Sequence, residues 1–364
     1  MINQIVDNVI NMREIYIYSL IILTGVIFSS CGSKKEVINT SSEESVNEVT
    51  QDQKCEVEFQ DESVSDFLDK SIELEVLASG FEIAEGPVWV PSKKMFLFSD
   101  VKGNKIHSWT QDEGLNVFLS PSGHTGSVPF FEGCVLGSNG LTLDSDGQLI
   151  ICQHGDRRLA KLSLDNVSQE GLSTLVDKFE GKRFNSPNDL TVAANGDIYF
   201  TDPPYGMAEL ENDPAREIDY NGIYRLSPEG EIQLLERNQT RPNGLVFSPD
   251  EETLYVANSD AENKVWYAYT VIHGIIGNPR IFYDVNDQSG EGAADGMKVD
   301  IEGNIFATGP GGVWVFDPDG THLGTIKPSE VPANVAWGDD GSTLYMTART
   351  GLYRVRLSTS GEIP

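Results

Sequence analysis

Short apolar runs alternate with turn residues along the chain from about residue 72 onward. The clearest runs read KMFLFSD, QLIICQ, DIYFTD, TLYVAN, NIFATG and TLYMTA. Each run follows a turn such as SDG, ANG, SPDEE, IEG or DDGS, and another apolar run precedes that turn. Runs of this length at regular spacing predict β-strands in a sandwich, a barrel or a propeller.

The period of this pattern decides among the three architectures. The strand that opens each unit begins at one of six polar residues: Glu85, Asn139, Asn188, Asn243, Asp295 and Asn334. Successive members of this set are 39 to 55 residues apart, which is too long for one hairpin and suits a four-stranded blade. The sequence therefore predicts an all-β fold, a six-bladed β-propeller.

The two ends of the domain are predicted to share one blade. Only three strands, NVAWG, TLYMTA and GLYRVRL, belong to the unit that Asn334 opens. The run IELEVLA (Ile72–Ala78) at the start of the domain supplies the missing fourth strand. Such pairing would close the ring of blades and cover the sheet edges that would otherwise be exposed.

The six blade-opening residues are candidates for one site. In a propeller the first strand of each blade lines the central channel, so these side chains would form a ring of oxygen atoms at one mouth. Carboxylate and amide oxygens are hard ligands that favour calcium, magnesium or manganese over zinc or copper. Two carboxylates with several Asn carbonyls suit calcium. In the alternative interpretation the Asn side chains bond only to loop backbones, as Asn does in many turns.

Charge excludes one class of partner. The chain has 56 acidic and 26 basic residues, and its net charge of −30 leaves no basic surface for a nucleic acid. An acidic protein can attract cations, although most of these carboxylates are expected to be solvated surface.

The N-terminal region is a different kind of sequence. Residues 15–28 form an apolar run, shorter than a bilayer span of about 20 residues, with Arg13 before it and Ser29, Ser30 and Cys31 after it. We interpret residues 1–31 as a lipoprotein-type signal peptide whose lipobox Cys31 becomes the lipidated N-terminus. An uncleaved anchor helix is the alternative.

These features set the predicted domain organisation and location. Residues 32–71 are polar and are predicted to be a flexible tether, and residues 72–364 are predicted to be the propeller. The expected location is a bacterial cell envelope, as a periplasmic or outer-membrane lipoprotein that contacts the membrane only through its lipid anchor. We expect a monomer.

Five segments in the same order resemble one known family. AEGPVW, NGLTLDSDGQLIICQHGDRRL, NSPNDLTVAANGDIYFTDPPYG, RPNGLVFSPDEETLYVANS and DGMKVDIEGNIFATGPGGVWVFDPDG are similar to the bacterial gluconolactonase branch of the regucalcin/gluconolactonase (senescence marker protein) family. The similarity covers roughly residues 72–356. It implies a metal-dependent lactonase with six blades.

The resemblance also implies roles for individual residues. Glu85, Asn243 and Asp295 would bind one divalent cation, expected to be Ca²⁺, and Asn188 would complete the metal shell or hold substrate through a water. Asp295 would double as the catalytic acid/base. The animal branch carries an Arg where this chain has Ser186, so the sugar preference of that branch does not carry over.

The remaining candidates lie near the same mouth. Asn139, His154 and Tyr205 are candidates for substrate binding, and the insertion from Ser122 to Ser138 is interpreted as a lid that carries Phe130 and Phe131.

The predicted reaction is calcium-dependent hydrolysis of a sugar lactone, such as gluconolactone, to the aldonic acid. No G-x-S-x-G motif supports a serine nucleophile. Two alternatives remain: a non-catalytic, calcium-stabilised propeller that binds a partner, and a hydrolase of another ester.

Overall fold

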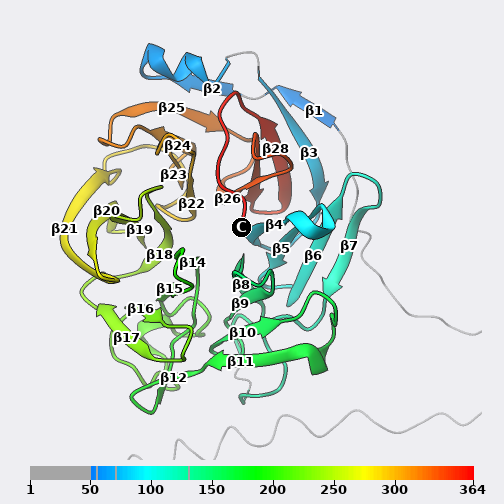
Figure 1. Ribbon diagram of the computed structural model, residues 1–364, viewed down its shortest axis with the longest axis vertical. Coiled ribbons are helices and arrows are strands. Elements are labelled where there is room, and N and C mark those ends of the chain that lie inside the picture. Colours follow the sequence, from blue (N-terminus) through cyan, green and yellow to red (C-terminus); the bar gives the residue numbers. More distant parts are fainter. Residues whose placement is uncertain (1–50, 55, 70–71, 130–131) are drawn as a thin grey trace, which may run out of the picture. The chain divides into compact units, whose positions relative to one another are not determined.

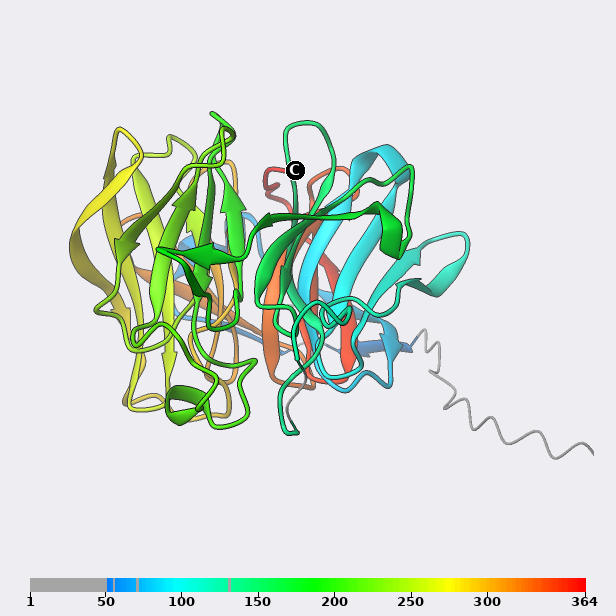
Figure 2. The same ribbon diagram turned by 90° about the horizontal axis from the view of Figure 1, so that it is seen from below.

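The domain is built from six β-sheets around a common centre. The computed structural model describes residues 51–364 except Cys55, residues 70–71 and residues 130–131. Figure 1 shows the sheets surrounding this centre, with the C-terminal end of the chain close to it, and Figure 2 shows the same sheets from the side. The predicted all-β, six-bladed propeller is confirmed.

Part of the N-terminal prediction lies outside the described residues. The signal peptide (1–31) with its Cys31, and residues 32–50 of the tether, belong to this part of the chain. Among the residues that are described, no helix is long and apolar enough to cross a membrane.

Three blades come from the first half of the propeller. Blade 1 consists of β4 (Ala84–Val90), β5 (Met95–Asp100), β6 (Lys105–Thr110) and β7 (Gly114–Leu119). Blade 2 consists of β8 (Ser138–Leu143), β9 (Leu149–Gln153), β10 (Arg158–Leu162) and β11 (Leu172–Val176). Blade 3 consists of β14 (Leu190–Val192), β15 (Ile198–Asp202), β16 (Gly222–Leu226) and β17 (Ile232–Glu236). A short hairpin of β12 (Lys178–Phe179) and β13 (Lys182–Arg183) links blades 2 and 3.

Three further blades complete the ring. Blade 4 consists of β18 (Pro242–Phe247), β19 (Thr253–Asp260), β20 (Asn263–Ile272) and β21 (Ile275–Asp284). Blade 5 consists of β22 (Met297–Val299), β23 (Ile305–Gly309), β24 (Gly312–Phe316) and β25 (His322–Lys327), with β2 (Glu56–Phe59) outside. Blade 6 consists of β26 (Pro332–Gly338), β27 (Thr343–Ala348), β28 (Gly351–Arg356) and β3 (Glu73–Ser79), with β1 (Gln51–Lys54) outside. The 3₁₀ turns are η1 (Glu62–Asp66), η2 (Pro91–Lys93), η3 (Gln169–Gly171) and η4 (Leu210–Asn212).

The start and end of the domain meet in blade 6. Strand β3 pairs antiparallel with β28, so that Ala78 lies opposite Leu352 and Ser79 opposite Gly351. The predicted closure is confirmed. The innermost strands of all six blades contact their neighbours in sequence, and β26 contacts β4 to complete the circle.

The core lies between adjacent blades. Because successive side chains of a strand point to opposite faces of the sheet, a strand buried on both faces supplies two cores. In β5, Leu97 packs with residues of blade 2, whereas Phe96 and Phe98 pack toward blade 6. The Phe96 ring stacks on Tyr345 of blade 6 with centroids 4.2 Å apart. This double burial explains why the second strands read as nearly continuous apolar runs.

The predicted tether extends too far along the chain. Within residues 51–69 the structure has two strands and the turn η1, and β2 pairs with β25 of blade 5. Val64 and Leu68 are fully buried in the core between blades 5 and 6. A few apolar residues are enough to pack a mostly polar segment against an existing core. The average composition of the segment does not reveal them. The ordered domain therefore begins before residue 72.

Candidate functional site

Irregular strand pairing occurs at the start of several innermost strands and takes two blade-opening residues, Asn139 and Asn243, out of the regular hydrogen-bond ladder. The pairing of β4 skips from Glu85 to Val88, and that of β8 skips from Ser138 to Leu141. In β18 it skips from Pro242 to Leu245. A bulge leaves the skipped residues unpaired and bends the strand, so it can redirect a side chain. In this way Asn139 and Asn243 are free to turn toward the channel.

A glycine after the blade-opening residue lets neighbouring blades approach closely. Gly86 has a φ of +54°, and a Cβ atom there would collide with the main-chain oxygen of Asn139. Gly140 donates a hydrogen bond to the main-chain oxygen of Asn188 at 2.7 Å. The same close approach recurs between Gly244 and the start of blade 5. These contacts bring the backbones at the openings of blades 1, 2 and 3, and of blades 4 and 5, close together.

One amide links the first, third and last blades across the ring. Asn334 donates from Nδ2 to Glu85 Oε2 and to Asp189 Oδ2, each at 3.2 Å. Its Oδ1 accepts from the Val335 N–H at 2.9 Å. Asn334 therefore acts as a donor to two carboxylates, and its oxygen accepts from its own main chain.

Asp189 is a member of the site that our sequence reasoning missed. It is buried, and it occupies the place that glycine takes after Glu85, Asn139, Asn243 and Asp295 in other blades. A carboxylate at a position that is glycine in four of the other five blades was the available signal.

Three carboxylates disfavour one another's ionisation. Burial and the charge of Asp189 raise the pKa of Glu85 to about 7. Burial also raises the pKa of Asp189, against the opposing effect of Lys298. Burial, Glu85 and Asp189 raise the pKa of Asp295 well above its usual range. The surrounding protein thus supplies too little positive charge to favour ionisation of all three carboxyl groups together.

Asp295 has an unsatisfied oxygen. Its Oδ1 atom is buried and has no hydrogen-bond partner among the described residues. The residue borders a pocket of about 350 Å³ at this mouth, together with Glu82, Ile83, Pro332 and Arg349. A buried polar atom without a partner is unusual in a folded protein and indicates a place where another molecule or ion binds.

Asn243 and Tyr205 meet at a serine. Asn243 donates from Nδ2 to Ser259 Oγ at 3.2 Å, and the Tyr205 hydroxyl lies 2.6 Å from the same Oγ. Arg241 lies over the Tyr205 ring, 5.6 Å from its centroid, and pairs with both carboxylate oxygens of Glu211. The charge of Asp295 also contributes to the raised pKa of Tyr205, after burial. The structure therefore brings Tyr205 beside Asn243.

Asn139 and His154 form a second pair. Asn139 Nδ2 lies 3.5 Å from His154 Nε2, and both side chains are buried. Burial lowers the pKa of His154 to about 4, so the imidazole is neutral at physiological pH. Asn188 is buried between these residues and blade 4, and its N–H donates to Thr201 O at 2.9 Å.

The predicted lid is tied to blades 1 to 3. Gly137 N donates to Val101 O, next to β5, at 2.8 Å; Ser138 N, at the start of β8, donates to Ser122 Oγ at 3.1 Å; and Val135 N donates to Gly206 O at 3.1 Å. Phe130 and Phe131 lie outside the described residues. His124 and Leu136 from this segment line a small cavity of about 30 Å³ that His154 also borders. The segment is thus a wall next to His154.

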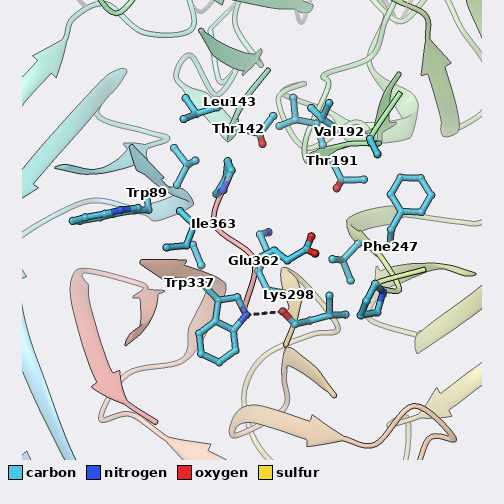
Figure 3. Close-up of a pocket in the computed structure, with 18 of the residues that line it drawn as sticks. Trp89, Thr142, Leu143, Thr191, Val192, Phe247, Lys298, Trp337, Glu362 and Ile363 are labelled. Atoms are coloured by element: carbon cyan, nitrogen blue, oxygen red, sulfur yellow. Dashed lines mark hydrogen bonds between the residues drawn. The ribbon is translucent and has the colours of Figure 1, made fainter. Parts of the chain in front are cut away.

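The other end of the channel has a different character. A cavity of about 440 Å³ lies there, lined by later residues of the innermost strands and by the C-terminal Glu362, Ile363 and Pro364. Figure 3 shows Lys298 and Glu362 near its middle, with Trp89, Phe247 and Trp337 around them. Its lining contains none of the predicted site residues. The candidate site is therefore at the carboxylate-bearing mouth.

The donor set bears on whether a metal ion fits. No group of three or more His, Cys, Asp or Glu side chains in the described ranges has the arrangement of a metal site. The predicted set contains two carboxylates, Glu85 and Asp295, and two amides, Asn188 and Asn243, so it is not a group of that kind. Its chemistry fits a hard cation, because the uncompensated carboxylates and the free oxygen of Asp295 favour positive charge.

Comparisons with known proteins identify relatives over most of the propeller. Residues 83–350 match the family model described as the SMP-30/Gluconolactonase/LRE-like region. A gluconolactonase of Zymomonas mobilis subsp. mobilis is 42% identical over 301 residues, covering 81% of this chain and 84% of that protein. A pentonolactonase of Haloferax volcanii is 28% identical over 280 residues, covering 76% and 84%.

A solved structure extends the similarity to the fold. It is that of a gluconolactonase from Xanthomonas campestris, which is 29% identical, covers 85% of this chain and 97% of that chain, and superposes with a TM-score of 0.73. The family match, the sequence identity and the shared six-bladed fold lead to one conclusion: this chain belongs to the SMP-30/gluconolactonase/LRE-like family.

Proposed function

We propose that the protein hydrolyses a sugar lactone, such as gluconolactone, to the aldonic acid with the aid of one divalent cation, Ca²⁺. The observation that carries this proposal is Asp295, a carboxylate with a buried, unpartnered oxygen beside two further carboxylates at the mouth of the channel. The gluconolactonase and pentonolactonase relatives support the lactone as substrate.

The proposed cation site uses residues of four blades. Glu85, Asn243 and Asp295 would hold the ion, and Asn188 would complete the shell or hold substrate through a water. When bound, the cation would polarise the lactone carbonyl and stabilise the negative charge that develops on its oxygen. The amide of Asn243 suits this role because its Nδ2 is engaged by Ser259, which leaves Oδ1 available.

Asp295 is proposed as the general base. It would accept a proton from the attacking water as the water oxygen bonds to the lactone carbonyl carbon. The bond between that carbon and the ring oxygen then breaks, and the same proton passes to the ring oxygen, which becomes a hydroxyl. The product is the open aldonic acid, which ionises in water. Asp295 must be ionised for the first step, and a cation bound beside it would oppose the raised pKa of its carboxyl group.

The neighbouring polar groups would recognise the sugar. Asn139, His154 and Tyr205 are proposed to contact substrate hydroxyls, and a neutral imidazole can donate through one nitrogen and accept through the other. His154 Nδ1 is buried and has no partner in the described part of the protein, so it retains hydrogen-bonding capacity.

We also propose that the enzyme is anchored in a bacterial cell envelope through a lipid on Cys31. The lipobox-like IFSSC sequence after the apolar run supports this proposal. Intact-mass analysis of the membrane fraction tests it, because the mature chain should begin at a diacylated Cys31. A soluble chain that still begins at Met1, or at Met12 if translation starts there, would contradict it.

A substrate panel tests the proposed reaction. Aldonolactones and simple aryl esters would be assayed with calcium and with a chelator, following acid release in a weakly buffered indicator solution. We expect lactone turnover above the uncatalysed rate, lost with chelator and restored by calcium. Turnover of the esters alone would indicate a different ester hydrolase, and no turnover of either would indicate a binding module.

A further inference from the structure

Ser259 is placed to decide which atom of the Asn243 amide faces the axis. It is the seventh residue of β19, the second strand of blade 4, and it is 8% exposed. Ser259 is not one of the six blade-opening residues, because it reaches the mouth from the neighbouring strand. Its Oγ has three partners: Asn243 Nδ2 at 3.2 Å, the Tyr205 hydroxyl at 2.6 Å and the main-chain oxygen of Arg241 at 3.3 Å.

The Ser259 hydroxyl can accept from the Asn243 amide in any arrangement of its own proton. A serine hydroxyl has one proton to donate and two lone pairs to accept with. The main-chain oxygen of Arg241 accepts the Ser259 N–H at 2.9 Å and also lies 3.3 Å from the hydroxyl. Whether the Ser259 proton goes to Arg241 or to Tyr205, Oγ keeps a lone pair for Asn243 Nδ2.

The contact with Ser259 sets which amide atom is left for the axis. With Nδ2 on Ser259, Asn243 Oδ1 is available. If Asn243 were turned over, Oδ1 would take the Ser259 proton and Nδ2 would point its protons toward the axis, where they would repel a cation. A cation at the axis therefore favours the orientation in which Ser259 accepts from Nδ2.

We propose that Ser259 is a positioning residue that holds the Asn243 carbonyl oxygen toward the cation site by accepting a hydrogen bond from Asn243 Nδ2. The inference rests on the proposed cation at Glu85, Asn243 and Asp295. Residues that orient a metal ligand typically contribute about 10- to 100-fold to metal affinity. The same network links the ion to the substrate wall, because Tyr205 belongs to both.

Calcium binding measured by titration calorimetry tests the proposal. Ser259→Ala should weaken calcium binding by about 10- to 100-fold relative to the wild type. Ser248→Ala is the matched control: Ser248 also makes several hydrogen bonds in blade 4, but it lies beyond the opposite end of β18, and calcium affinity should not change. Equal affinity in Ser259→Ala and the wild type would overturn the inference.

A double-mutant cycle distinguishes orientation of the Asn243 amide by Ser259 from a general stabilising effect of Ser259 on the loop. In an Asn243→Asp background both side-chain outer atoms are oxygens, so no orientation has to be chosen. Ser259→Ala should then cause little further loss of calcium affinity. A loss of the same size in both backgrounds would overturn the inference and leave Ser259 a structural role only. A wild-type protein that neither binds calcium nor hydrolyses lactone would instead overturn the proposed function, and this inference with it.

Discussion

Asn334 donates a hydrogen bond to Glu85 at 3.2 Å, although 249 residues separate them in the chain. The same Nδ2 donates to Asp189, so one amide neutralises part of the charge of two buried carboxylates. This contact joins the last blade to the first and third at the mouth of the channel. Because its amide is used in this way, Asn334 is a structural member of the ring. Asn243, whose Nδ2 is bound by Ser259, is instead a candidate ligand.

Removal of this amide should destabilise the propeller. Asn334→Ala leaves Glu85 and Asp189 without their shared donor, and hydrogen bonds to charged groups contribute about 1.5–3 kcal/mol each. We therefore expect a loss of at least about 1.5 kcal/mol in urea unfolding of the metal-free protein. Asn238→Ala is the control, since its amide bonds only to the nearby Glu236 on the surface, and it should unfold like the wild type. An unchanged midpoint for Asn334→Ala would contradict this role.

Calcium should stabilise the protein more at high pH than at low pH. Glu85 has a folded pKa of about 7, above its ordinary value of 4.5, and the pKa values of Asp189 and Asp295 are also raised. For an acid whose folded pKa is raised, the folded state binds protons more tightly, so stability falls as pH rises from the unfolded to the folded pKa. The metal-free protein should therefore lose stability between about pH 4.5 and 7.

Thermal unfolding at pH 5 and pH 8, with calcium or chelator, measures this effect. The rise in Tm that calcium produces should be larger at pH 8, because the ion binds the ionised carboxylates. Glu85→Gln should reduce the pH dependence of the metal-free protein. A calcium effect of equal size at both pH values would show that these carboxylates do not hold the ion.

The close contact at Gly86 predicts a large effect of one methyl group. Gly86→Ala forces a left-handed conformation on alanine and a collision with the main chain of Asn139. Gly147→Ala is a suitable comparison, because Gly147 has a φ of +71° and nothing within 4 Å of the added atom. The second variant should lose about 1–2 kcal/mol from backbone strain alone. Urea unfolding should show a clearly larger loss for Gly86→Ala; equal losses would contradict the packing described at the mouth.

The N-terminal segment should contribute to stability. Leu68 is fully buried in the core between blades 5 and 6, so Leu68→Ala should lower the free energy of unfolding by about 2–5 kcal/mol. Val167→Ala, at a partly exposed surface valine, is the control and should change little. If Leu68→Ala unfolded like the wild type, the segment would be a dispensable attachment and residue 72 the better domain boundary.

Local patterns account for what could be predicted from the sequence. Strand length, turn residues and the spacing of Glu85, Asn139 and Asn188 are all visible in short windows, and they led to the blade count and the closure by β3. For Asp189 the only local signal was a carboxylate where four other blades have glycine, and Ser259 could not be found in this way. The position of Asp189 depends on Asn334 in another blade, and that of Ser259 on the fold of β18 against β19. The N-terminal strands were missed for the same reason, since β2 pairs with a strand about 270 residues later.

The most direct test of the account is the rate of gluconolactone hydrolysis by Asp295→Asn at saturating calcium, with bound calcium measured in the same sample. The substitution keeps a ligand oxygen and nearly the same shape but removes the base. The account predicts that the variant retains much of its calcium while its turnover falls by about 10²–10⁴-fold, whereas the wild type loses turnover only when calcium is removed. Turnover equal to that of the wild type in calcium-loaded Asp295→Asn would contradict the assignment of Asp295 as the general base.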